Sequence, residues 1–109
     1  MTRTNVEGER GAFSDDATRS WSLPSRYYTE PAVLERELIH IFRRAWICVG
    51  HACDLREPGS YLTERVANQP VLVIRAKDGQ VRAFFNVCQH RGHELLRGNG
   101  RLPGGITCP

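Results

Sequence analysis

Three short runs with the character of β-strands, the first of them alternating between apolar and polar residues, constrain the fold of this chain more than any other feature of its sequence. The runs cover residues 61–66, 71–75 and 81–87. Turn signals separate them, namely Pro58-Gly59, Asn68-Gln69-Pro70 and Ala76-Lys77-Asp78-Gly79. The last of these predicts a hairpin, because Gly79 can adopt the positive φ that tight hairpin turns require. The pattern predicts a mainly β fold, a small antiparallel sandwich or barrel.

The residues before the strands predict one amphipathic helix. Thr29 is the expected N-cap, and Pro31 falls in the first turn, where a missing N–H has no cost. Apolar residues then recur at helical spacing up to Ala45, which gives about four turns. We therefore expect a flexible tail over residues 1–20, a segment with one helix over 21–45, and a β domain over 46–109. Residues 46–51 form a further short run with strand character.

Length, composition and charge exclude several classes of function. A chain of 109 residues is consistent with one domain. No apolar run approaches the roughly 18 residues that a membrane span needs, and the N-terminus carries no secretory signal. The net charge of +3 comes from scattered arginines rather than a basic patch. We expect a cytoplasmic protein that binds neither nucleic acid nor membrane.

The C-terminal part combines soft metal ligands with glycine. Cys88-Gln89-His90 is followed by 17 residues and then by Cys108-Pro109, and five glycines lie in this stretch. In an extended segment, residues at i and i+2 project to the same side, so Cys88 and His90 could present a thiolate and an imidazole together. Such mixed sets suit zinc or an iron–sulfur cluster, although zinc sites usually open with two cysteines two to four residues apart.

These residues also resemble a known family. The segment 86–92, together with Leu95, Gly98, Gly100 and Cys108-Pro109, resembles the Rieske [2Fe–2S] domain of ring-hydroxylating-type oxygenase α subunits. Upstream residues, among them Trp46 and Pro58-Gly59, follow the same family order, so the resemblance covers about residues 21–109. It implies a small Rieske-type antiparallel sandwich preceded by the helix.

The resemblance implies a ligand set. Cys88 and Cys108 would be thiolate ligands of one iron, and His90 an imidazole ligand of the other. The family's second histidine falls three positions after Cys108, and the sequence stops at Pro109. The family's catalytic domain, with its mononuclear non-haem iron, is also not in this sequence. We therefore interpret the chain as an N-terminal fragment, truncated before its last ligand and without catalytic residues. As given, it is expected neither to catalyse a reaction nor to hold a stable cluster.

The implied function is electron acceptance in a non-haem iron oxygenase. Members of the family use O₂ and electrons from a reductase or ferredoxin to hydroxylate or demethylate aromatic or quaternary-amine substrates. The loop 91–96 resembles members that act on quaternary amines. The parent protein is expected to be a homo-oligomer of α subunits. Two other functions stay open from the sequence: a stand-alone Rieske ferredoxin that carries electrons, and a structural zinc module.

The remaining notable side chains receive simpler interpretations. Cys48 lies in an apolar run and is expected to be a small core residue. His51 and Cys53 repeat the ligand spacing in reverse, but packing or hydrogen bonding is the expected role. His93, between the ligands, is expected to face solvent. Core or rim packing is predicted for the aromatic residues Trp21, Trp46, Phe84 and Phe85.

Overall fold

The computed structural model describes residues 14–20 and 22–109. The chain forms two compact units, Met1–Ile41 and Phe42–Pro109, and each is described by itself. Most of the predicted flexible tail, and Trp21, lie outside the described residues. Residues 16–19 form a turn in which the carboxylate of Asp16 accepts hydrogen bonds from the N–H and hydroxyl of Thr18 at 3.0 and 2.7 Å.

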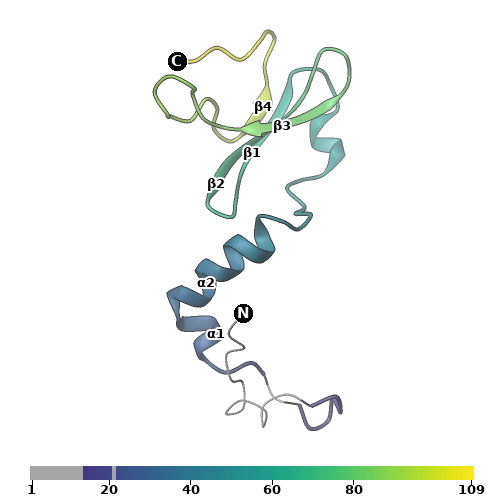
Figure 1. Cartoon of the computed structure of the whole chain (residues 1–109). Helices are drawn as coiled ribbons and strands as arrows, with labels where there is room; N and C mark the ends of the chain where they lie inside the picture. Colours follow the sequence, from purple (N-terminus) through teal and green to yellow (C-terminus); the bar gives the residue numbers. More distant parts are fainter. Residues whose placement is uncertain (1–13, 21) are drawn as a thin grey trace. The chain divides into compact units, whose positions relative to one another are not determined.

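The predicted single helix consists of three pieces (Figure 1). A short α1 (Arg26–Thr29) precedes α2 (Pro31–Glu37), which continues as a π-helical turn, η2 (Leu38–Phe42). The prediction of Thr29 as N-cap was wrong, because Thr29 ends α1 and Glu30 caps α2. The cause is Pro31, which disfavours helical geometry at the preceding residue, and Glu30 accordingly has ψ of 120°. Pro31 itself begins α2, as predicted.

In the second unit, a 3₁₀ turn, η3 (Ala52–Leu55), precedes a four-stranded antiparallel sheet. The run at 46–51 was predicted to have strand character, and it is not a strand. The sheet order is β3-β2-β1-β4, and Figure 1 shows the four strands side by side. The strands are β1 (Ser60–Val66), β2 (Gln69–Arg75), β3 (Val81–Phe85) and β4 (Asn99–Arg101). The prediction of a mainly β, antiparallel fold is confirmed.

Tight turns join the first three strands: the turn before β3 lies where the sequence predicts it, whereas the turn predicted at Asn68-Gln69-Pro70 lies at residues 67–68, and Gln69 and Pro70 belong to β2. The N–H of Ala76 donates to the carbonyl of Gln80 at 2.8 Å, and Gly79 has φ of +83°. The β1–β2 turn is formed by Ala67 and Asn68, both with positive φ. These paired left-handed residues give the twist that a two-residue hairpin needs.

A small core lies between η3 and one face of the sheet. Leu55, Leu62 and Val73 are buried together, with Val49 and Val71 packed against them. Leu62 and Val73 are register partners in β1 and β2, so their side chains share one sheet face. Leu72, which is 1% exposed, points to the opposite face.

Several residues predicted to pack inside are exposed. Cys48 is exposed rather than part of the core, and Trp46 is fully exposed. The side chains of Phe84 and Phe85 are also more than half exposed. Apolar residues that are adjacent in the sequence are therefore not all buried in this structure.

Gly59 joins three segments of the second unit. Its N–H donates to the carbonyl of Arg75 at 2.8 Å, and its own carbonyl accepts from the N–H of Leu102 at 2.9 Å. It has φ of +89°, and a β-carbon at this position would lie 2.1 Å from the carbonyl oxygen of Leu102. Only glycine fits, and the contact fixes where the segment leading to Cys108 begins.

No helix among the described residues is long and apolar enough to cross a membrane.

Candidate metal centre

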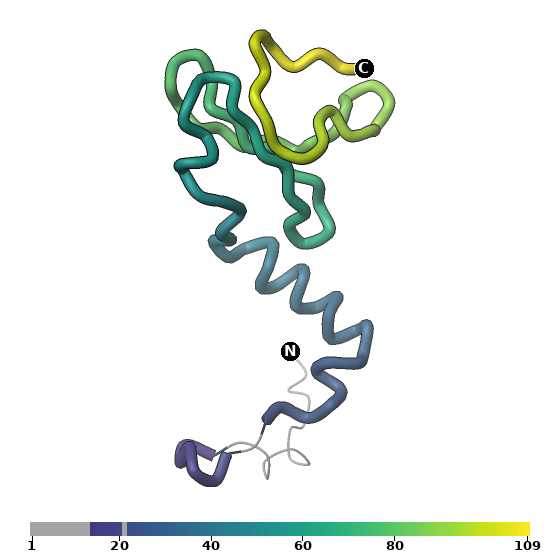
Figure 2. Tube along the Cα trace, turned by 180° about the vertical axis from the view of Figure 1, so that it is seen from behind, coloured from purple at the N-terminus to yellow at the C-terminus, as the bar shows by residue number. Residues whose placement is uncertain are grey.

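Two loops bring the predicted thiolate ligands together. Cys88 lies in the loop between β3 and β4, and Cys108 lies in the segment after β4. In Figures 1 and 2, the yellow C-terminal segment ends beside the green loop that follows β3. The sulfur atoms of Cys88 and Cys108 are 3.1 Å apart, and both residues are free thiols. Two loops distant in sequence thus present one pair of sulfur atoms.

The segment from Cys88 to His93 is a closed turn, which corrects the expectation of an extended segment. The N–H of Cys88 donates to the carbonyl of His93 at 2.8 Å, and the N–H of Gly92 donates to the carbonyl of Cys88 at 3.0 Å. Gly92 has φ of +69°, which lets the chain reverse. His90 therefore lies in the exposed turn, two residues from Cys88 but not on a shared strand face.

His93 takes the place beside the thiols. Its Nε2 atom is 3.4 Å from the sulfur of Cys108, and the side chain is half-buried. The donor atoms of Cys88, His93 and Cys108 all lie within 4.8 Å of one another, the single group of this kind among the described residues. The expectation that His93 faces solvent was wrong. Gly92 is the sequence feature that could have indicated the position of His93. A glycine can adopt positive φ and so turn the following histidine back toward Cys88.

The two thiols have opposite pKa shifts because they share one hydrogen bond. The thiol of Cys108 and the N–H groups of the 90–92 turn donate to the sulfur of Cys88, and this lowers the pKa of Cys88. The same hydrogen bond, followed by desolvation and the charge on Cys88, raises the pKa of Cys108. Of the two thiols, Cys88 therefore has the lower pKa.

A hollow of about 880 Å³ adjoins the thiol pair. Cys88, His90 and Cys108 all line it, so the three predicted ligands border one space, although the imidazole of His90 is not among the clustered donor atoms. The rest of the lining is largely apolar and includes Leu72, Phe84, Phe85, Leu95 and Ile106. An apolar wall beside two thiols is a suitable setting for a metal group that must be shielded from water.

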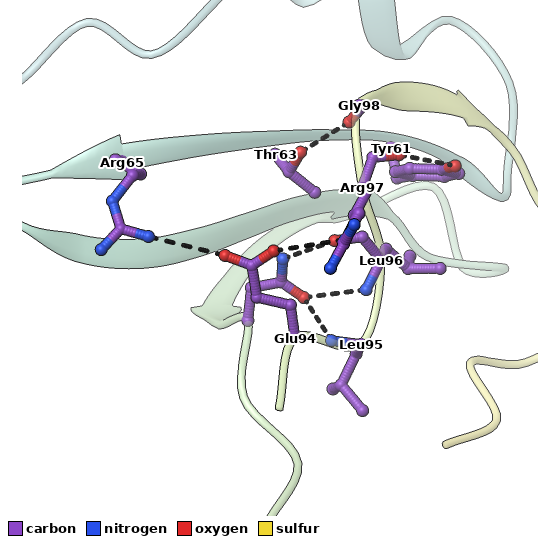
Figure 3. Close-up of polar contacts among 9 residues, drawn as sticks. Tyr61, Thr63, Arg65, Glu94, Leu95, Leu96, Arg97 and Gly98 are labelled. Carbon is purple, nitrogen blue, oxygen red and sulfur yellow. Dashed lines mark hydrogen bonds and ion pairs between the residues drawn. The ribbon is translucent and has the colours of Figure 1, made fainter. Parts of the chain in front are cut away.

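Asn86 fastens the ligand loop at its start. It is 2% exposed, and its side-chain oxygen accepts hydrogen bonds from the N–H groups of Leu95 and Leu96 at 3.1 and 3.0 Å. In the same loop, Glu94 forms ion pairs with Arg65 at 3.5 Å and with Arg97 at 3.7 Å (Figure 3). The sequence places Asn86 in the motif of residues 86–92 but does not indicate that it holds this loop.

The far end of the same loop is tied to β1. The N–H and the hydroxyl of Thr63 donate to the carbonyl of Gly98 at 3.0 and 2.7 Å (Figure 3). The loop from Asn86 to Gly98 is therefore held at both ends. Such support orients metal ligands and limits their motion.

His51 and Cys53, weighed above as a second half-site, serve another purpose. The Nδ1 atom of His51 accepts from the N–H of Cys53 at 3.1 Å, and the N–H of His51 donates to the carboxylate of Asp54 at 3.3 Å. The pair caps η3. The prediction of a hydrogen-bonding role is confirmed.

Comparison with known proteins decides the family. The model of the Rieske [2Fe–2S] domain matches residues 45–109, which is more than half of the chain. The chain belongs to the Rieske [2Fe–2S] domain family. The resemblance seen in the sequence is thereby confirmed, and the Rieske domain implies a [2Fe–2S] cluster. The thiol pair fits the thiolate half of such a cluster, because two cysteine sulfurs at this separation can bind one iron.

Relatives of this Rieske domain are oxygenase subunits. The chain is 47% identical to the carnitine monooxygenase oxygenase subunit of Acinetobacter baumannii, over 83% of this chain and 24% of that protein. It is 38% identical to the biphenyl 2,3-dioxygenase α subunit of Rhodococcus jostii, over 83% of this chain and 20% of that protein. The chain spans about a quarter of the length of the curated relatives it matches.

A solved structure shows the same fold. The quaternary ammonium Rieske monooxygenase in complex with L-carnitine matches 83% of this chain and 26% of that chain, with a TM-score of 0.78 and 47% identity. The described fold is thus the fold of one part of such an oxygenase chain.

Proposed function

We propose that this chain is the electron-accepting Rieske domain of a non-haem iron oxygenase α subunit. The observation that carries the proposal is the meeting of the Cys88 and Cys108 sulfurs, from two separate loops, at 3.1 Å beside a hollow that His90 also lines. The assignment of Cys88, His90 and Cys108 as cluster ligands is part of this proposal. When bound, a [2Fe–2S] cluster supplies storage for a single electron.

The chain's own groups have definite tasks in this function. Cys88, the thiol of lowered pKa, is ready to bind iron as a thiolate. The N–H groups of the 90–92 turn donate toward its sulfur and would stabilise negative charge there. Apolar side chains of the hollow lie on one side of the thiol pair, and the turn with His90 is exposed.

A quaternary-ammonium substrate is the proposed substrate class of the parent protein. It is supported by the 47% identity to a carnitine monooxygenase subunit, against 38% to a biphenyl dioxygenase subunit. An aromatic substrate is the second candidate. The catalytic centre, a mononuclear non-haem iron, would belong to a domain outside this chain, and this chain is proposed to contain no catalytic residue.

The partners follow from the same assignment. We propose a reductase or ferredoxin as electron donor, a homo-oligomer of α subunits and a cytoplasmic location. The exposed aromatic side chains of Trp46, Phe84 and Phe85 support burial against further protein, because large apolar groups on a monomeric domain mark interaction surfaces.

The alternatives are less well supported. A stand-alone Rieske ferredoxin would share the cluster, but both curated relatives above are oxygenase subunits about four to five times as long as the matched region. A structural zinc module as the chain's function is disfavoured by the family match.

The test is spectroscopic and uses the full-length α subunit that carries this segment. We expect Rieske-type absorption and EPR signals after reduction by a ferredoxin or reductase, and oxygen-dependent turnover of carnitine or betaine. A Rieske signal with turnover only of aromatic substrates would overturn the substrate class alone. The absence of any iron–sulfur signal would overturn the whole proposal.

A further inference from the structure

We propose that Cys88, His93 and Cys108 form a three-ligand site for a single divalent ion of the zinc class when no cluster is bound. This site differs from the proposed cluster ligands because it uses His93 in place of His90. Its donor atoms already lie within 4.8 Å of one another. The inference rests on this geometry and does not depend on the proposed function.

The backbone builds the site before any metal arrives. The hydrogen bond from the N–H of Cys88 to the carbonyl of His93, at 2.8 Å, closes the turn, and Gly92 supplies the reversal. His93 is thereby held next to Cys88, although four residues lie between them in sequence. His90 lies in the middle of the turn and is exposed. The turn therefore selects one of the two histidines as a neighbour of the thiols.

The interatomic distances are close to those of a tetrahedral zinc site. With Zn–S bonds of 2.3 Å and Zn–N bonds of 2.0–2.1 Å, tetrahedral angles place two sulfurs about 3.8 Å apart and a sulfur and a nitrogen about 3.6 Å apart. The observed distances are 3.1 Å between the sulfurs and 3.4 Å between Cys108 Sγ and His93 Nε2. A metal ion would open the sulfur pair by about 0.7 Å and leave the nitrogen close to its present position.

The donor chemistry selects the ion. Two thiolates and one imidazole are ligands that zinc prefers over hard cations such as magnesium, and two thiolates neutralise the charge of a divalent ion. Cys108 is exposed, so an ion can reach the site, while Cys88 is buried. Three protein ligands leave a fourth position for water. Because both thiolates are shared, zinc and a cluster exclude each other.

The test uses the 109-residue chain, prepared free of iron and kept reduced. Zn²⁺ affinity is measured by competition with a chromophoric chelator, and Co²⁺ serves as a spectroscopic probe of tetrahedral thiolate ligation. His93→Ala is compared with His90→Ala as the matched control. Loss of a second-shell group already costs 10- to 100-fold in metal affinity, so we expect His93→Ala to weaken Zn²⁺ binding at least about 100-fold. His90→Ala should change it less than about 3-fold.

A second measurement needs no variant and is therefore independent of folding defects. In the wild-type chain, Zn²⁺ should protect Cys88 and Cys108 from alkylation by iodoacetamide, while the exposed Cys48 and Cys53 react as before. Weaker binding in His90→Ala than in His93→Ala, equal weakening in both, or no protection of Cys88 and Cys108 would each overturn the proposal. Iron and sulfide content after reconstitution is measured separately, so failure of the cluster assignment is distinguishable from failure of this site.

Discussion

The side-chain amide of Asn86 donates a hydrogen bond of 2.7 Å to the carbonyl of Leu96. The same side chain accepts from the N–H groups of Leu95 and Leu96, so a single buried side chain makes three hydrogen bonds to the backbone nine and ten residues onward. Asn86 immediately follows β3 and lies two residues before Cys88. It therefore connects the end of the sheet to the far side of the ligand loop.

Replacing Asn86 with alanine should destabilise the domain. The change leaves backbone groups of Leu95 and Leu96 without partners in a partly buried position, which costs about 1–3 kcal/mol. Denaturant unfolding measures the loss. Asn99→Ala is the matched control, since Asn99 is exposed in β4 and its loss should cost no more than about 0.5 kcal/mol. Equal losses in the two variants would show that Asn86 does not fasten the loop.

A second prediction concerns glycine at two turns. Both Gly59 and Gly79 have positive φ, so alanine at either position carries backbone strain of about 1–2 kcal/mol. A β-carbon at Gly59 would also meet the carbonyl oxygen of Leu102 at 2.1 Å, whereas at Gly79 it would meet nothing within 4 Å. Gly59→Ala should therefore cost about 2 kcal/mol more than Gly79→Ala in thermal or denaturant unfolding. Similar costs would contradict the close approach of Leu102.

A third prediction concerns pH and the β2–β3 hairpin. The guanidinium of Arg82 donates two hydrogen bonds to Asp78, at 2.9 and 2.6 Å, and this lowers the pKa of Asp78 to about 2. The folded pKa lies below the unfolded value near 3.9. The pair's contribution is therefore complete above about pH 4 and is lost as pH falls from about 4 to 2. Because both groups are largely exposed, the contribution is small.

NMR titration of the Asp78 carboxyl carbon checks this shift. In Arg82→Gln, the pKa of Asp78 should rise toward its ordinary value, because the main cause of the shift is removed. Lys77→Gln removes one positive charge beside Asp78 in sequence without touching the hydrogen bonds, and should leave most of the shift in place. An Asp78 titration that Arg82→Gln does not move would show that the ion pair does not form in solution.

The fourth prediction concerns the proposed cluster ligands. In the full-length α subunit, Cys88→Ser or Cys108→Ser should remove the iron–sulfur absorption and most of the bound iron. Cys48→Ala is the control, because Cys48 is exposed and lies outside the thiol pair. Iron and sulfide analysis with absorption spectra measures the effect. Loss of the cluster in Cys48→Ala with retention in Cys88→Ser would invert the ligand assignment.

The sequence predicted correctly those features that depend on a few neighbouring residues. The hairpin at Asp78-Gly79 and the start of α2 at Pro31 depend on residues within a few positions, and both are confirmed. Strand β4 was missed because its three residues, two of them polar and one glycine, show no alternation and gain their structure from pairing with β1. The prediction that Cys48 is buried was wrong for a similar reason, because the apolar residues around it in the sequence do not show which residues pack against it in the fold.

The candidate site shows the same division. The pairing of Cys88 with Cys108 followed from the motif and is present in the structure. The geometry of the histidines could not be predicted from spacing, because an i, i+2 argument assumes an extended chain and the 88–93 segment is a turn. Turn formation moved His93 to the thiols and left His90 in the exposed part of the loop.

The pairing of β1 with β4 sets the order in which the thiols can meet. Ser60 is the register partner of Arg101, so the segment that carries Cys108 is positioned by a strand from the start of the sheet. This is the longest-range strand pairing described, and long-range pairings form late in folding because loop closure is slow. Cys88 can reach its place once the β2–β3 hairpin exists, but Cys108 cannot. A metal group that requires both sulfurs would therefore be captured only by chains that have finished folding.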